Sequence, residues 1–138
     1  MKILCTICAR GGSKGLKNKN IKIINGKALI EHTIFKAKKS KIFSKIVVSS
    51  DNKRILNISK SNNVDYLIKR SKRLSLSSTP KIPVIRDALK KAEKKFLIKF
   101  DYIMDLDVSS PLRNVADIKK SMKKIVREKK NILFSVNN

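Results

Sequence analysis

The chain begins with a short apolar run and a glycine-rich loop, and from residue 3 onward it reads Ile3-Leu4-Cys5-Thr6-Ile7-Cys8-Ala9-Arg10-Gly11-Gly12-Ser13-Lys14-Gly15-Leu16-Lys17-Asn18-Lys19-Asn20. Six apolar or small residues that end at a glycine signal are typical of a buried strand. Glycines let the backbone turn sharply, and successive bare N–H groups in such a turn form a concavity that binds anions. This stretch therefore predicts a strand followed by an anion-binding loop.

Three cationic side chains in the loop, Arg10, Lys14 and Lys19, suit a polyphosphate better than a neutral metabolite. The plainer alternative is a glycine turn flanked by lysines that are abundant everywhere. Lysine and arginine together number 34 of 138 residues, so any loop would contain some of them. Composition alone leaves both readings open.

Beyond the loop, apolar periodicity alternates between strand and helix. Strands are predicted at residues 3–8, 45–49, 64–68, 102–106 and 132–136. Helices are predicted at 28–40, 52–61, 82–96 and, after a cap at Asn114, up to about residue 128. A short extended piece at 21–24 turns at Asn25-Gly26, and the serine-rich stretch 71–80 is irregular.

This alternation predicts an α/β fold with three layers, in which helices cover both faces of a mostly parallel, Rossmann-like sheet. The length fits one nucleotide-binding domain over residues 1–138. Ligands of such sheets bind beyond the carboxyl ends of the strands. The loops after Cys8, Ile68 and Leu106 all lie at such ends, so we expect them to form one site.

The composition limits where the protein acts. Hydrophobic residues make up 41% of the chain, and no apolar run approaches the ~20 residues of a membrane span. Met1-Lys2 leads directly into the first strand, which leaves no room for a signal peptide. We therefore expect a cytoplasmic protein with no membrane partner.

The formal net charge of +24 raises the hypothesis of a nucleic-acid-binding protein. The lysines, however, are spread over every predicted helix and loop. Aromatic residues make up only 5% of the chain, so a platform for stacking bases is poorly supplied. These features predict nonspecific, salt-dependent binding of polyanions at low salt rather than sequence recognition.

Cys5 and Cys8 form a C-x-x-C pattern, but residues three apart on a strand point to opposite faces. The sequence has no further cysteine, and His32 is its only histidine, so a zinc site lacks ligands. We interpret both cysteines as small core residues, and His32 as a surface or hydrogen-bonded residue rather than a catalytic base.

The run Ala9-Arg10-Gly11-Gly12-Ser13-Lys14-Gly15, followed by Lys19-Asn20, resembles the nucleotide-binding loop of the acylneuraminate (CMP-sialic acid) cytidylyltransferases. Its glycine spacing fits neither G-x-G-x-x-G nor the P-loop. The stretch Asp107-Val108-Ser109-Ser110-Pro111-Leu112-Arg113 is similar to the family's Q/D-x-T/S-S-P-L-R segment, and Ser50-Asp51 to its S-T-D. The resemblance implies a nucleotide-diphospho-sugar transferase-like fold, with CTP and an acidic nine-carbon (nonulosonic, sialic-type) sugar as substrates. It also implies CMP transfer to the sugar with release of pyrophosphate, and Mg²⁺ as cofactor.

The resemblance also implies roles for individual residues. Catalytic roles fall on Arg10, Lys14 and Lys19. Nucleotide-binding roles fall on Ala9, Arg10, Gly11, Gly12, Ser13, Lys14, Asn20, Arg70 and Asp107. Ser110 and Arg113 would support the substrate or the loop, with an internal ion pair as the alternative for Arg113. For Asp51, a helix cap is preferred over a ligand role.

The sequence departs from the family pattern at Lys17, where proline is frequent, and at Ser77-Ser78-Thr79-Pro80-Lys81, where an Asp-Thr-Ala-Ser-Ser-like patch is usual. The family's paired metal-binding aspartates, sugar pocket and dimerisation arm follow later in its catalytic domain. The resemblance therefore implies that this chain is the N-terminal part of that domain, incomplete and truncated at the C-terminus. We therefore expect no metal ligands within this chain. The family forms a homodimer, which is doubtful for this chain, and the activity of the chain alone is doubtful as well. The alternatives are another sugar nucleotidyltransferase of the same fold, or a non-catalytic domain that binds nucleotides or polyanions.

Overall fold

The computed structural model describes residues 1–12, 17–110 and 112–129, so the strand predicted at 132–136 lies outside the described residues. The strands of the described part are β1 (Ile3–Cys8), β2 (Ile23–Ile24), β3 (Lys27–Ala28), β4 (Lys45–Ser50), β5 (Tyr66–Lys69) and β6 (Tyr102–Asp105). The α-helices are α1 (Leu29–Ser40), α2 (Lys53–Ser61), α3 (Lys81–Phe96) and α4 (Val115–Arg127). Two short 3-10 helices complete them, η1 (Lys19–Ile21) and η2 (Arg73–Ser75).

Over the described residues, the central sheet has four parallel strands in the order β5-β4-β1-β6. β1 lies inside this sheet, and its residues Ile3 to Ile7 are all buried, as expected of a strand covered on both faces. From β1 the chain moves outward through β4 to β5 and then returns to place β6 on the other side of β1. The gap between β1 and β6 is therefore the point where the strand order reverses, at which ligands of open α/β sheets bind.

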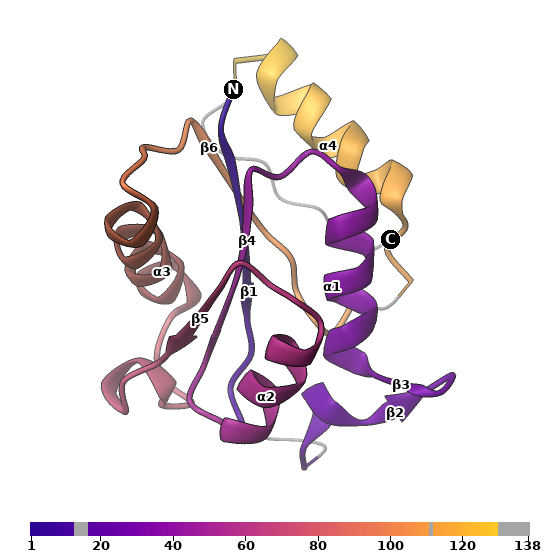
Figure 1. Ribbon diagram of the computed structural model, residues 1–138, viewed down its shortest axis with the longest axis vertical. Coiled ribbons are helices and arrows are strands. Elements are labelled where there is room, and N and C mark those ends of the chain that lie inside the picture. Colours follow the sequence, from indigo (N-terminus) through magenta and orange to yellow (C-terminus); the bar gives the residue numbers. More distant parts are fainter. Residues whose placement is uncertain (13–16, 111, 130–138) are drawn as a thin grey trace.

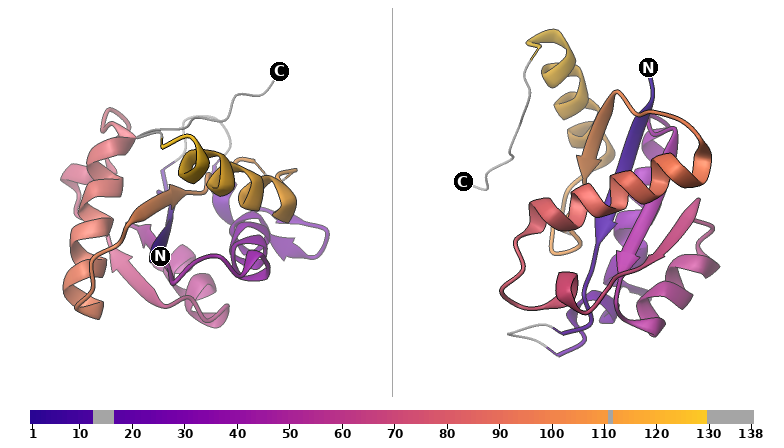
Figure 2. Two further views of the ribbon diagram at one scale, coloured as in Figure 1. Left: turned by 90° about the horizontal axis from the view of Figure 1, so that it is seen from above. Right: turned by 90° about the vertical axis from the view of Figure 1, so that its left-hand side faces the viewer.

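Helices cover both faces of the sheet, which confirms the predicted three-layer fold. Among the α-helices of the described residues, α1, α2 and α4 lie on one face and α3 lies on the other (Figure 1; Figure 2, left). Right-handed crossovers explain the placement of α3, because the connection from β5 to β6 runs across the sheet in the reverse direction. The larger core cluster includes Ile7, Ile30, Ile34, Ile55 and Ile118. The smaller one packs Leu4, Val47 and Ile68 against Ala88 and Ala92 of α3.

Local structure follows the sequence closely, with small shifts at element ends. Asn25 and Gly26 have φ angles of 51° and 78°, as a two-residue hairpin turn requires, and they join β2 to β3. β5 begins at Tyr66 instead of residue 64, because the side chain of Asp65 is hydrogen-bonded to the backbone of the neighbouring strand β4. Its carboxylate accepts a hydrogen bond from the Ile46 N–H at 2.7 Å. The predicted cap of α4 is confirmed, since Asn114 Oδ1 accepts from the Asp117 N–H at 2.8 Å.

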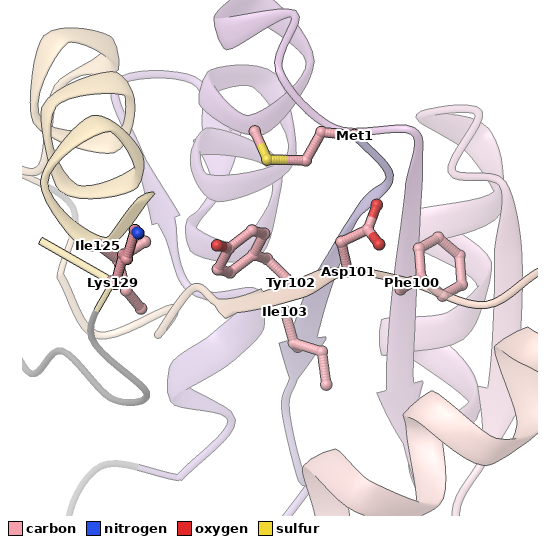
Figure 3. A pocket seen from close by; sticks show the side chains of 7 residues that line it. All are labelled: Met1, Phe100, Asp101, Tyr102, Ile103, Ile125 and Lys129. Carbon is pink, nitrogen blue, oxygen red and sulfur yellow. The ribbon is translucent and has the colours of Figure 1, made fainter. Parts of the chain in front are cut away.

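A cavity of about 800 Å³ opens at the amino-terminal ends of the strands, opposite the edge where the predicted site lies (Figure 3). Its lining consists of Met1, Phe100, Asp101, Tyr102, Ile103, Ile125 and Lys129. It brings together no cluster of cationic side chains, so it does not compete with the carboxyl edge as a phosphate site. Among the described residues, no helix is both long enough and apolar enough to cross a membrane.

Candidate functional site

The carboxyl ends of the four parallel strands bring four polar segments to one edge of the sheet. Residues 9–12 follow β1, Asp51 follows β4, Arg70 follows β5 and Asp107 follows β6. The described members of the predicted site therefore converge, as expected from strand order. Ser13 and Lys14 lie outside the described residues.

The loop after β1 is held by the end of β4. The Ala9 N–H donates to the Ser49 carbonyl at 2.9 Å, and the Gly11 N–H donates to Asp51 Oδ1 at 2.8 Å. A Cβ atom on Gly11 would lie 2.7 Å from Asn52 Nδ2, so close backbone approach requires glycine here. Asn52, not Asp51, caps α2 by accepting from the Ile55 N–H, which corrects the preferred reading of Asp51.

The same loop is braced from its far side by Asn20. Its Nδ2 donates to the Arg10 carbonyl at 2.9 Å, so the Asn20 amide fixes the loop backbone. Lys19 precedes it in η1, which begins after Asn18 in the left-handed conformation at φ 57°. The sequence placed Lys19 and Asn20 in the loop and began an extended piece at Ile21, so it did not indicate that these three residues form one 3-10 turn. Both residues stay predicted as ligand contacts.

Arg70 is a buried cation at the end of β5, with only 7% of its surface exposed. Its guanidinium donates to the Ser49 carbonyl at 2.9 Å and to Ser49 Oγ at 3.3 Å. Burial lowers the pKa of Arg70, and the negative charge of Asp51 partly offsets this effect. Within the described part of the chain no carboxylate lies within 4 Å of it. A buried guanidinium that has only neutral partners is suited to an incoming anion.

The loop after β6 is organised around Asp107. Asp107 Oδ1 accepts from the Ser109 N–H at 2.8 Å and from the Ser109 hydroxyl at 2.6 Å. Burial opposes ionisation, but these two donors and the charge of Lys81 outweigh it and lower the pKa of Asp107 to about 2. Asp107 is therefore a carboxylate at neutral pH.

The two predicted support residues lie in the same loop. The Ser110 N–H donates to the Asp107 carbonyl at 3.4 Å, and Arg113 Nη1 donates to the same carbonyl oxygen at 3.3 Å. Arg113 thus braces the loop through a backbone oxygen rather than through a carboxylate.

Two residues absent from the predicted site also lie at this edge. Lys81 Nζ is 2.7 Å from Asp105 Oδ2 and 3.3 Å from Asp107 Oδ2. Lys81 stood out in sequence only as a departure from the family pattern. Asp105 could have been found in the sequence from its spacing to Asp107, since alternate residues of a strand return to one face.

The cysteines lie on opposite faces of β1, as predicted. Cys5 is buried in the larger core cluster, and Cys8 lies near Asp105. Burial, reinforced by the charge of Asp105, raises the pKa of both thiols far above the ordinary value, so both stay protonated at neutral pH. In the described residues, no three acidic, histidine or cysteine side chains cluster in a way that could hold a metal ion.

Residues 4–136 match the sequence profile of the family described as cytidylyltransferase. The chain belongs to the cytidylyltransferase family. This match confirms the predicted resemblance at the level of the family.

Two curated relatives and one solved structure are similar to this cytidylyltransferase. Post-translational flagellin modification protein B of Campylobacter coli is 45% identical over 133 residues, which are 96% of this chain and 57% of that relative. CMP-N,N'-diacetyllegionaminic acid synthase of Campylobacter jejuni is 46% identical over 109 residues, 79% of this chain and 46% of the relative. The structure of CMP:2-keto-3-deoxy-manno-octonic acid synthetase complexed with CTP has a TM-score of 0.73 at 20% identity.

That structural match covers 94% of this chain and 49% of the solved one, and it confirms the fold. The chain spans about half the length of the curated relatives it matches.

Proposed function

We propose that this cytidylyltransferase binds CTP and transfers CMP to an acidic nine-carbon sugar with release of pyrophosphate. The observation that carries the proposal is the buried Arg70 beside the glycine loop of residues 9–12, at the carboxyl edge of the sheet. The name of the Campylobacter jejuni relative supports a nonulosonic acid as acceptor.

In this reaction an anomeric hydroxyl oxygen of the sugar bonds to the α-phosphorus of CTP, and the bond from that phosphorus to pyrophosphate breaks. The hydroxyl proton leaves to solvent or to a base. Such chemistry consists mostly of positioning and of stabilising charge on the phosphate oxygens. Arg10, Arg70 and the predicted Lys14 and Lys19 would supply that charge.

The residues described here do not fit a complete magnesium site. Asp51 already accepts a hydrogen bond from the Gly11 N–H of the loop. Asp105 and Asp107 already share the ammonium of Lys81, and a cation held there disfavours a second one. We propose Mg²⁺ only as the partner of the triphosphate.

Calorimetric titration of the purified 138-residue chain with CTP tests the proposal. Lys14→Ala should weaken binding by about 1.5–3 kcal/mol, because one charge-assisted phosphate contact is lost. Lys124→Ala on the exposed side of α4 removes the same charge elsewhere and should leave the affinity unchanged. Equal affinities of both variants and the parent chain would overturn the assignment. Pyrophosphate release with a panel of nonulosonic acids then tests the transfer.

A second candidate, binding of polyanions in general, is favoured by one observation. The exposed lysines are distributed over the ends and outer faces of α1, α3 and α4 and do not form a single stripe. Such a distribution supports attraction without sequence recognition.

A further inference from the structure

Lys81, the first residue of α3, lies at the gap between β1 and β6 and bridges two carboxylates. Its Nζ lies 2.7 Å from Asp105 Oδ2 and 3.3 Å from Asp107 Oδ2. The other oxygen of Asp105 accepts from the Thr6 hydroxyl at 2.8 Å. The other oxygen of Asp107 accepts from the amide and the hydroxyl of Ser109. Every carboxylate oxygen of the pair therefore has a donor.

The strands place this cluster under α3. Leu4 of β1 and Ile103 of β6 belong to the core cluster that packs against α3. Two residues further along each strand, Thr6 and Asp105 return to the same face, and they pair directly in the sheet register. The first turn of α3 covers this point, so Lys81 meets both acids.

The charges of the cluster depend on one another. Burial by itself would lower the pKa of Lys81, but the adjacent Asp105 and Asp107 outweigh it and raise that pKa. The Asp105 side chain is 14% exposed and tightly enclosed, whereas that of Asp107 is 52% exposed. Asp107 is thus the more accessible member of the pair. Without the ammonium, two like charges would stand close together beside a site for a triphosphate.

We propose that Lys81 is a positioning residue that holds Asp107 as a fixed acceptor for a hydrogen-bond donor of the bound nucleoside. The inference rests on the proposed CTP binding and deepens it. An ionised carboxylate only accepts hydrogen bonds. The donors of a cytidine nucleotide are its ribose hydroxyls and the exocyclic amino group of its base. Uracil carries a carbonyl in place of that amino group, and the deoxyribose of dCTP lacks the 2′-hydroxyl. Whichever of these two changes removes the donor would leave Asp107 without its hydrogen bond to the nucleoside.

The test compares the dissociation constants of CTP, dCTP and UTP by calorimetry for the 138-residue chain. The parent chain should prefer CTP over at least one of the other two by about tenfold or more, the usual effect of a hydrogen bond to a charged group. A preference over dCTP identifies a ribose hydroxyl as the donor, and a preference over UTP identifies the amino group. Lys81→Met should reduce that preference to about threefold or less.

Two variants separate the positioning of Asp107 by Lys81 from the general effect of removing a lysine from α3. Lys81→Arg keeps a cation against both acids and should restore the preference. Lys90→Met removes an exposed lysine of α3 nine residues away, about 13 Å along the helix, and should leave the preference intact. If Lys81→Met does not fold, Asp107→Asn takes its place, since it keeps the shape but removes the negative charge and replaces one of the two acceptor oxygens by an amide donor.

A full preference in Lys81→Met, or in Asp107→Asn, would overturn the inference. So would a parent chain that binds CTP, dCTP and UTP equally well, although CTP binding itself would then stand. A parent chain that binds no CTP would instead overturn the proposed function, and this inference with it.

Discussion

Asp51 Oδ1 accepts a hydrogen bond from the backbone N–H of Gly11 at 2.8 Å, which ties the end of β4 to the loop after β1. The next residue, Asn52, comes so close to Gly11 that no side chain fits between them. The shape of the loop is therefore set by two residues about forty positions away. Anion-binding loops need such support, because their N–H groups must point at the ligand before it arrives.

Gly11→Ala should destabilise the chain by about 1–3 kcal/mol, the usual cost of forcing extra atoms into a packed site. The new Cβ would lie 2.7 Å from Asn52 Nδ2 and 2.9 Å from Asn52 Cβ, so the loop or α2 must shift. Urea denaturation measures the change, and CTP affinity should fall with it. Gly12→Ala is the matched control, since its nearest neighbour would be Arg10 Nη1 at 3.7 Å. Equal stability losses in the two variants would contradict the close packing at Gly11.

Arg70→Met should separate binding from stability. We expect CTP affinity to fall by about 10- to 100-fold, because a charge-assisted phosphate contact is worth about 1.5–3 kcal/mol. The free energy of unfolding should change by no more than about 1 kcal/mol, since a methionine fills much of the volume and a buried cation is costly to fold. The Ser49 carbonyl keeps a donor, the Ala9 N–H, in this variant.

Arg86→Met is the control for Arg70→Met, because it removes an exposed guanidinium from α3. It should alter neither CTP affinity nor stability. A large stability loss in Arg70→Met with unchanged CTP affinity would show that Arg70 serves the fold alone.

Most of the fold was predictable because it depends on local sequence patterns. Apolar periods located the strands and helices, Asn25-Gly26 marked the hairpin, and Asn114 marked the start of α4. The start of β5 at Tyr66 was not predictable, since the role of Asp65 depends on its contact with Ile46 in the neighbouring strand.

The candidate site was predictable only in part, and for the same reason. The sequence indicated which loops would meet, because parallel strands bring their carboxyl ends to one edge. It did not indicate that Lys81 would bridge Asp105 and Asp107, because their contact depends on strand order and on the face that α3 covers. Likewise, the bond between Asp51 and Gly11 depends on the pairing of β4 with β1.

Asp107 should make stability depend on pH in the acid range. Its pKa is about 2 in the folded chain, below the ordinary value of an aspartate. Because the folded-state pKa is lowered, its stabilising contribution is complete above about pH 5 and is lost as the pH falls toward 2. The difference in unfolding free energy between the parent chain and Asp107→Asn should therefore shrink between pH 5 and pH 3. Urea titrations at a series of pH values measure it.

Ser109→Ala provides the control for this effect. It removes the hydroxyl that donates to Asp107 Oδ1 at 2.6 Å, so the pKa of Asp107 should rise toward the ordinary value. NMR titration of the carboxyl carbon would detect the shift. An unchanged pKa in Ser109→Ala would mean that the hydroxyl does not hold the charge.

Salt should separate CTP binding from the binding of polyanions. With a formal charge of +24 spread over the surface, a nucleic acid can meet many lysines at once. A complex with six to ten phosphate contacts loses about 10³- to 10⁵-fold in affinity between 50 and 200 mM salt, because bound counterions are released. Fluorescence anisotropy with labelled DNA of several sequences should show this steep loss for all of them, whereas CTP, which carries few charges, should lose far less.

A charge-reduced variant sharpens that test, since α4 carries four exposed lysines, Lys119, Lys120, Lys123 and Lys124. Their replacement by glutamine should weaken DNA binding and flatten its salt dependence, because fewer counterions are released. CTP affinity should stay unchanged, since α4 packs beside α1 and lies away from β5, the strand that Arg70 follows (Figure 1). Tight binding of one DNA or RNA sequence that persisted at physiological salt would contradict the nonspecific interpretation, because attraction by scattered charge cannot distinguish one sequence from another.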